Sequence, residues 1–195
     1  MKKKILVLAA LAIAVAIAAT GTLAYFTATG TARNVITSGG ISIAIEEKTQ
    51  NGDALVDFPK EGLQGIMPGA TASKIVRIKN TGPNEAWIRV QITSYITDSD
   101  KKEELPDMID GQIPVMTYEV LPGWTLKDGW YYYNAPVAPG AKTDELLQEV
   151  TFAPQMGNEY QNCRANLVIS AQAVQTANNG ETVLEAKGWP DGTSD

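Results

Sequence analysis

Hydrophobic and polar residues alternate along much of this chain with the two-residue period of a β-strand. Between Ile41 and Ile45 the isoleucines alternate with small residues, and residues 167–173 give one wholly apolar face. Turn signals such as Asn51-Gly52, Pro68-Gly69 and Pro122-Gly123 separate these segments. We therefore expect strands over residues 41–45, 73–79, 86–92, 115–121, 129–134, 146–152 and 165–174.

Two neighbouring segments predict a β-hairpin. Residues 73–79 and 86–92 are of equal length and flank the turn Asn80-Thr81-Gly82-Pro83-Asn84. A connection of about five residues commonly joins two antiparallel strands. We therefore expect these two strands to pair with each other.

Only the end of the chain has a helical pattern. Residues 181–187 contain helix formers with acid early and lysine late, Asn178 or Asn179 can cap the start, and Gly188 can end it. Residues 98–114 are charged and predict a loop. Seven or eight short strands without alternating helices predict an all-β fold, an antiparallel β-sandwich with a short C-terminal helix, and exclude a βαβ enzyme fold.

The first residues predict a secretory signal peptide. Lysines at positions 2–4 precede an apolar run over residues 5–19, and small residues follow. Thr22 and Ala24 are the small residues that a signal peptidase needs, so we expect cleavage between Ala24 and Tyr25, and secretion. A retained membrane anchor is the alternative, but the apolar run is shorter than the roughly 20 residues that span a bilayer.

The net charge limits the possible partners of the chain, and the cysteine count limits its possible disulfides. The chain has 16 basic and 22 acidic residues, a net charge of −6, and cleavage would remove three of the basic residues. A negative surface repels nucleic acid and anionic lipid, so we expect no nucleic-acid partner, and membrane contact only through the uncleaved signal peptide. Cys163 is the single cysteine, which excludes an intramolecular disulfide and predicts a small buried side chain.

The absence of histidine excludes several kinds of catalysis. A chain without histidine cannot form a Ser-His-Asp triad, a Cys-His pair or an HExxH zinc site. We therefore expect no catalytic residues, no metal site, no cofactor and no enzymatic activity.

Two other clusters have structural interpretations. The aromatic run at residues 130–133 predicts a strand that divides its rings between two faces, with core packing on one of them. The acidic residues of the charged loop could supply oxygen ligands to calcium, but they lack the spacing of a known calcium loop and predict a solvated surface. These residues are Asp98, Asp100, Glu103, Glu104, Asp107 and Asp110.

Several stretches of sequence occur in a distinctive order. They read GTLAYFT and NVITSGGISI near the start, then MPGATASKIVRIKNTGPNEAWIRV, DGWYYYNAPVAPGAKTDELL and AQAVQTANNG. Each alone is a common strand-and-turn pattern. In this order and spacing they resemble the TasA/camelysin family of Gram-positive bacteria over nearly the whole chain.

The resemblance implies a jelly-roll β-sandwich exported to the cell surface or the biofilm matrix. Members of the TasA branch form matrix fibres in which the N-terminal segment of one subunit pairs as a strand with the next subunit. We therefore expect residues 25–35, which favour a strand with one face of small residues, to carry assembly. The candidate residues are Tyr25, Phe26, Ala28, Gly30, Ala32 and Val35. The alternative is a flexible leader, or a strand that pairs within its own sheet.

These expectations divide the chain into three parts, which are a signal peptide over 1–24, an assembly segment over 25–40 and a β-sandwich domain over 41–195. The function expected is that of a secreted structural protein that associates with itself, and with other matrix proteins, into extracellular fibres. The first alternative is a monomeric surface or matrix accessory protein of the same fold. A metalloprotease, the activity with which camelysins have been associated, is the less favoured alternative.

Overall fold

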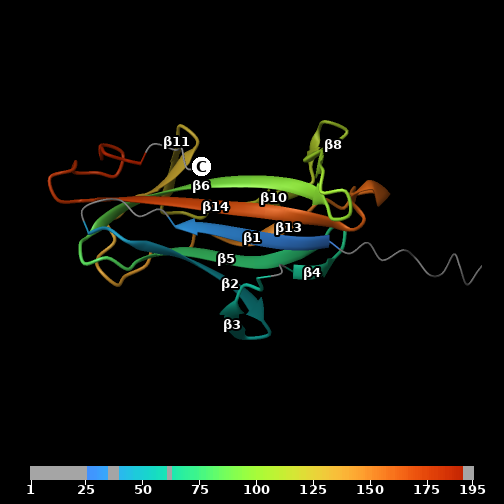
Figure 1. The fold of residues 1–195 in the computed structure, drawn as a ribbon, viewed down its shortest axis with the longest axis horizontal. Helices are drawn as coiled ribbons and strands as arrows, with labels where there is room; N and C mark the ends of the chain where they lie inside the picture. The colour runs from blue at the N-terminus through green and yellow to red at the C-terminus, as the bar shows by residue number, and fades with distance from the viewer. Residues whose placement is uncertain (1–25, 35–39, 61–62, 191–195) are drawn as a thin grey trace, which may run out of the picture.

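The computed structural model describes residues 26–34, 40–60 and 63–190, and strands form nearly all of the regular structure in these ranges (Figure 1). The one helix described is a short 3₁₀ turn, η1 (Asn158–Tyr160), so no helix in this part of the chain is long and apolar enough to cross a membrane. The strands are β1 (Phe26–Asn34), β2 (Ile43–Asn51), β3 (Ala54–Asp57), β4 (Leu63–Ile66), β5 (Thr71–Asn80), β6 (Ala86–Asp98), β7 (Glu104–Leu105), β8 (Met108–Ile109), β9 (Ile113–Pro114), β10 (Met116–Tyr118), β11 (Trp124–Lys127), β12 (Trp130–Tyr133), β13 (Leu147–Phe152) and β14 (Cys163–Gln175).

Two large sheets form the body of the molecule. The seven-stranded sheet has the order β11-β12-β6-β14-β1-β4, with β7 beside β6, and the five-stranded sheet has the order β10-β13-β5-β2-β3. Strands β8 and β9 form a separate hairpin, which lies away from the two sheets in Figure 1. The sequence predicted antiparallel pairing throughout, but β1 and β14 run parallel, which a first and a last strand can do because the whole domain connects them.

One hydrophobic core lies between the two large sheets. Val76 and Ile78 from β5 and Phe152 from β13 pack with Ile88 and Ile169 from the opposite sheet, and all five are fully buried. Because successive side chains on a strand point to opposite faces, this core accounts for the alternating pattern of the sequence. The mostly β fold that the sequence predicts is therefore confirmed.

Each of the seven segments predicted as strands overlaps an observed strand. The predicted hairpin between residues 73–79 and 86–92 is wrong, because β5 pairs with β2 and β13 whereas β6 pairs with β14, β12 and β7. The turn between them therefore crosses from one sheet to the other. Strands β3, β4 and β11 were not predicted, and β7, β8 and β9 lie within the segment predicted as a charged loop.

The crossing turn is built around the buried side chain of Asn80. Its Nδ2 donates to the carbonyl oxygens of Asn84 and Val137 at 2.7 and 2.8 Å, and its Oδ1 accepts from the Gly82 N–H at 2.9 Å. A Cβ at Gly82 would lie 2.8 Å from backbone atoms of Gly40 and Ser42, so this position requires glycine. These bonds direct the chain out of the first sheet, which a hydrophobic pattern alone does not encode.

The predicted helix over residues 181–187 is also wrong, because that segment forms turns. The side chain of Asn179 closes a loop by accepting from the Lys187 N–H at 2.8 Å and donating to the Lys187 carbonyl at 3.0 Å. Val183 and Ala186 are buried against the outer face of the seven-stranded sheet. Tertiary contacts thus override the helical propensity of the segment.

The aromatic run divides between two faces as expected. Tyr133 belongs to the main core, with Tyr131 packed against it, whereas Tyr132 is buried on the outer face with Trp87. Trp130 packs on the same outer cluster. Both faces of β12 are therefore covered, one by the opposite sheet and the other by the C-terminal segment.

Candidate assembly site

Strand β1 occupies an internal place in the seven-stranded sheet, although it is the first strand described. It lies between β14 and β4, and Figure 1 shows it beside β14. Residues 27–34 pair in parallel with residues 164–171, and Phe26 and Ala28 pair with Ile66 and Leu63 of β4. Both edges of β1 are therefore hydrogen-bonded to neighbouring strands.

The register brings the predicted assembly residues beside the core positions of β14. Three small residues of β1 are the Cα partners of three residues that are at most 2 % exposed. These pairs are Ala28 with Ala165, Gly30 with Leu167, and Ala32 with Ile169. The register therefore places the backbone of these candidate positions directly beside core positions of β14.

The remaining predicted positions are not described. Thr22, Ala24, Tyr25 and Val35 lie outside the described residues, so the cleavage site and the ends of the assembly segment stay predictions. In this single chain β1 pairs within its own sheet, which is the arrangement that the alternative interpretation named. Pairing between chains stays a prediction as well.

The sequence analysis missed β4, the second neighbour of β1. This strand is only four residues long and contains Gly65, so it carries almost no alternation. The one signal near it is the turn Pro68-Gly69 that follows. Within the described ranges β4 pairs only with β1, so β4 depends on β1 for its place in the sheet.

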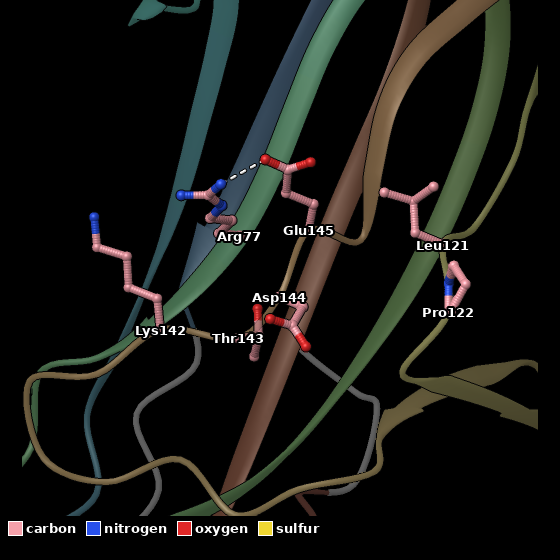
Figure 2. Close-up of a pocket in the computed structure, with 7 residues that line it drawn as sticks. All are labelled: Arg77, Leu121, Pro122, Lys142, Thr143, Asp144 and Glu145. Atoms are coloured by element: carbon pink, nitrogen blue, oxygen red, sulfur yellow. Dashed lines mark hydrogen bonds and ion pairs between the residues drawn. The ribbon is translucent and has the colours of Figure 1, made fainter.

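A cleft of about 560 Å³ lies on the outer side of the five-stranded sheet. Figure 2 shows Arg77 of β5 reaching toward Glu145, and these two side chains form an ion pair at 2.5 Å. The hydrogen bonds from Gln148 and Arg77 hold the pKa of Glu145 below its usual value. The residues that line the cleft are Arg77, Leu121, Pro122, Lys142, Thr143, Asp144 and Glu145.

The other polar groups of this cleft also have structural partners. Lys142 pairs with Glu46 at 2.6 Å, and Asp144 accepts a hydrogen bond from the Tyr133 hydroxyl at 3.0 Å. The Thr143 hydroxyl accepts from the backbone N–H of Ile78 at 3.0 Å. Because these groups hold the loop before β13 against β2, β12 and β5, we assign no chemistry to the cleft.

A buried ion pair lies near the start of β5, on the side of β2. The Nζ of Lys74, which is 3 % exposed, lies 2.8 Å from the Glu47 carboxylate and 3.9 Å from the centre of the Phe58 ring. Burial lowers the pKa of Lys74, while the carboxylate of Glu47 opposes this effect. A register shift between Val76 and Ser73 in the pairing of β5 with β13 adds one residue to β5 here, which changes the alternation.

The acidic loop has an ordinary hydrogen-bonded structure. The Asp98 carboxylate accepts from the backbone N–H groups of Asp100 and Lys101 at 2.9 and 3.1 Å, and it lies 3.6 Å from the Lys101 ammonium. These bonds lower the pKa of Asp98. Among the residues that the structure describes, no group of three acidic, cysteine or histidine side chains is arranged to hold a metal ion.

Comparison with known proteins adds no relative: no family model matches the chain, and no curated protein or solved structure matches it significantly.

Proposed function

We propose that this protein is a secreted structural protein of the TasA/camelysin type that assembles into extracellular fibres by exchanging β1 between copies. The observation that carries the proposal is the place of β1, a strand from the start of the chain that sits between β14 and β4. The proposal includes a jelly-roll arrangement of the two sheets, cleavage after Ala24 and no enzymatic role.

Removal of β1 from its own sheet would leave a gap between β14 and β4 that only another strand can fill. The edge of β14 would lose its parallel partner along residues 164–171, and β4 would lose the one strand with which it pairs in the described ranges. Unpaired backbone groups beside a hydrophobic core are costly to leave open. A second copy's β1 can restore the same bonds, because the register does not depend on which chain supplies the strand.

Exchange of this kind propagates. Each copy gives its β1 to one neighbour and receives a β1 from another, which is a head-to-tail contact. Such a contact forms an open filament unless the rotation between copies happens to close a ring. The main-chain hydrogen bonds of β-strand addition supply much of the attachment.

The test compares the chain that begins at Tyr25 with a chain that lacks residues 25–35. We expect the first to form filaments that sediment at high speed and the second to stay monomeric. A synthetic peptide of residues 25–35 should bind the truncated chain and raise its melting temperature, because it restores both pairings, whereas a scrambled peptide should not. Equal sedimentation of the two chains, or equal effects of the two peptides, would contradict strand exchange.

A monomeric accessory protein is the second candidate, and one observation favours it. In the single chain β1 already makes its full set of parallel bonds with β14. A chain whose own β1 fills the position between β14 and β4 needs no strand from a second copy. Filaments of the chain that begins at Tyr25 would decide against this candidate.

A further inference from the structure

Strand β3 presents an exposed apolar edge. All four of its residues are exposed, and Leu55 and Val56 remain 52 % and 38 % accessible to solvent. β3 pairs with residues 48–51 of β2, whereas β5 pairs with residues 43–48. The β2–β3 hairpin therefore extends beyond the sheet, as Figure 1 shows, and the outer edge of β3 has no neighbouring strand in the described part of the chain.

Contacts at its base hold the exposed hairpin in a fixed conformation. An ion pair across the hairpin, two bonds to Ser73 of β5 and one further backbone bond brace it. They are Lys48 with Asp57, Thr49 Oγ1 to the Ser73 carbonyl at 2.9 Å, the Gln50 N–H to Ser73 Oγ at 3.0 Å, and the Phe58 N–H to the Glu47 carbonyl at 3.0 Å. Because the edge is already ordered, pairing with a partner loses little conformational entropy.

A second copy of β3 complements this edge. In an antiparallel pair with two-fold symmetry, opposite residues share a face, so the axis must pass where one residue faces its own counterpart. With Leu55 opposite Leu55 of the second copy, Ala54 lies opposite Val56, and three consecutive pairs are apolar. Centring the pair on Val56 instead would place Leu55 opposite Asp57 and bury a carboxylate beside an apolar side chain.

The charges at the ends of this pairing oppose it only in part. In the register centred on Leu55, the pair beyond Val56 brings Asp57 opposite Asp53. Asp57 is already paired with Lys48 within its own hairpin, and this bond lowers the pKa of Asp57. The lysine reduces the repulsion between the two carboxylates.

We propose that β3 is a self-recognition edge, through which two copies of this chain pair antiparallel about a two-fold axis at Leu55. A four-residue strand buries far less than the roughly 1,000 Å² of a stable interface, so the contact between two single copies is weak. Repeated along a fibre, weak contacts reinforce one another. Together with the proposed function, this edge would join fibres side by side, although pairing of β3 does not itself depend on the exchange of β1.

Cysteine cross-linking tests the axis directly. Directly opposite residues of antiparallel strands have Cα atoms about 4.5 or 5.5 Å apart, within the span of a disulfide. Leu55→Cys in the full chain should therefore form a covalent dimer under mild oxidation. Leu126→Cys is the matched control, because Leu126 is 59 % exposed on the β11–β12 hairpin, and the native Cys163 is buried at 1 %. We expect about tenfold more dimer from Leu55→Cys than from the control at equal concentration.

A second substitution separates pairing from chance collision. Val56→Lys in the Leu55→Cys background places a charge against Ala54 of the second copy, and dimer formation should fall to the level of the control. Because Val56 is exposed, the variant should fold like the unsubstituted chain, and an unchanged urea midpoint would verify this. Equal cross-linking of Leu55→Cys and Leu126→Cys would overturn the proposal.

Sedimentation distinguishes this inference from the proposed function. Leu55→Lys should leave filaments that sediment at high speed but remove the bundles that sediment at low speed. Bundles that persist in this variant would overturn the inference alone. Absence of filaments from the unsubstituted chain would overturn the proposed function, and the cross-linking result would still decide on β3.

Discussion

Lys74 is the only charged residue among the described residues that is buried below one tenth exposure. Its ammonium contacts Glu47 on one side and the ring of Phe58 on another. A buried ion pair often contributes little net stability, since desolvation offsets the attraction, but removal of one partner leaves an uncompensated charge. A substitution that removes only one of the two charges should therefore destabilise the fold.

We expect Lys74→Met to lower the free energy of unfolding by roughly 3–5 kcal/mol, because Glu47 would remain largely buried without its partner. The double variant Lys74→Met with Glu47→Leu should recover most of this loss, because it removes both charges. Urea denaturation measures both effects.

The surface pair of Lys142 with Glu46 is the control. Lys142→Met should change the free energy of unfolding by about 1 kcal/mol or less, because the Lys142 side chain is 41 % exposed to solvent, against 3 % for Lys74. Equal losses for Lys74→Met and Lys142→Met would show that burial of Lys74 is not the reason for its effect.

The buried thiol of Cys163 predicts that the reactivity of this residue and the stability of the fold depend on pH. Burial raises the pKa of its thiol to about 11, so the folded protein should resist alkylation at pH 8 and react only when unfolded. Because the folded pKa is raised, its contribution to stability is complete below about pH 9 and declines as the pH rises toward 11, where the unfolded chain loses its proton first. Wild type should lose more stability over this range than Cys163→Ala, and equal slopes would contradict the assignment.

At the scale of elements, residues 179–189 pack against the outer face of the seven-stranded sheet, and we call this C-terminal segment the clasp. The Arg89 guanidinium of β6 lies between the rings of Trp130 and Trp189, at 4.2 and 4.6 Å from their centres. It also donates to the side-chain oxygen of Gln172 at 2.7 and 2.9 Å. Arg89 thus links β12, β6 and β14, the strand that pairs with β1, to Trp189 of the C-terminal segment.

Asn179→Ala should open this clasp. Its side chain makes three hydrogen bonds, two with the backbone of Lys187 and one with the Gln175 carbonyl, so their loss should cost roughly 1–3 kcal/mol in local stability. Hydrogen exchange of residues 180–189 should accelerate, while exchange in β5 should not change. The exposed Gln148→Ala is a suitable control, and an unaltered exchange rate in Asn179→Ala would contradict the clasp.

The elements also show what the sequence could predict. Alternation in β2 and β14 was readable because one face of each strand lies against the core. The hairpin between β5 and β6 was mispredicted because the turn that separates them is set by hydrogen bonds of Asn80, a contact with residues distant in the chain. The predicted helix over residues 181–187 was wrong for the same reason, since Val183 and Ala186 are buried by long-range packing.

The assembly segment was predicted as a strand, and β1 is one. Its partners were not predictable, because pairing with β14 joins residues more than a hundred positions apart and β4 has no clear pattern of its own. The burial of Lys74 could not be predicted either. The added residue in β5 interrupts the strict alternation of buried and exposed positions on which a sequence-based prediction depends.

At the scale of the whole molecule, β1 and β3 belong to different sheets. β1 lies next to the edge strand β4 of the seven-stranded sheet, and β3 is the edge strand of the five-stranded sheet. Two contacts on separate sheets can form at the same time. The exchange of β1 would then extend a filament, while pairing of β3 would connect one filament to another.

Net charge opposes every contact between copies. The full chain carries a net charge of −6, and the chain that begins at Tyr25 has 13 basic against 22 acidic residues, a net charge of −9. Two copies therefore repel one another, and this repulsion reaches about 30 Å at 0.01 M salt but only about 8 Å at 0.15 M. We therefore expect filament growth, followed by light scattering, to accelerate several-fold between these salt concentrations. The control is Glu103→Gln with Glu104→Gln, two acidic residues that are both exposed, and this less negative variant should depend less on salt. Growth that slows with added salt would show instead that attraction between opposite charges drives assembly.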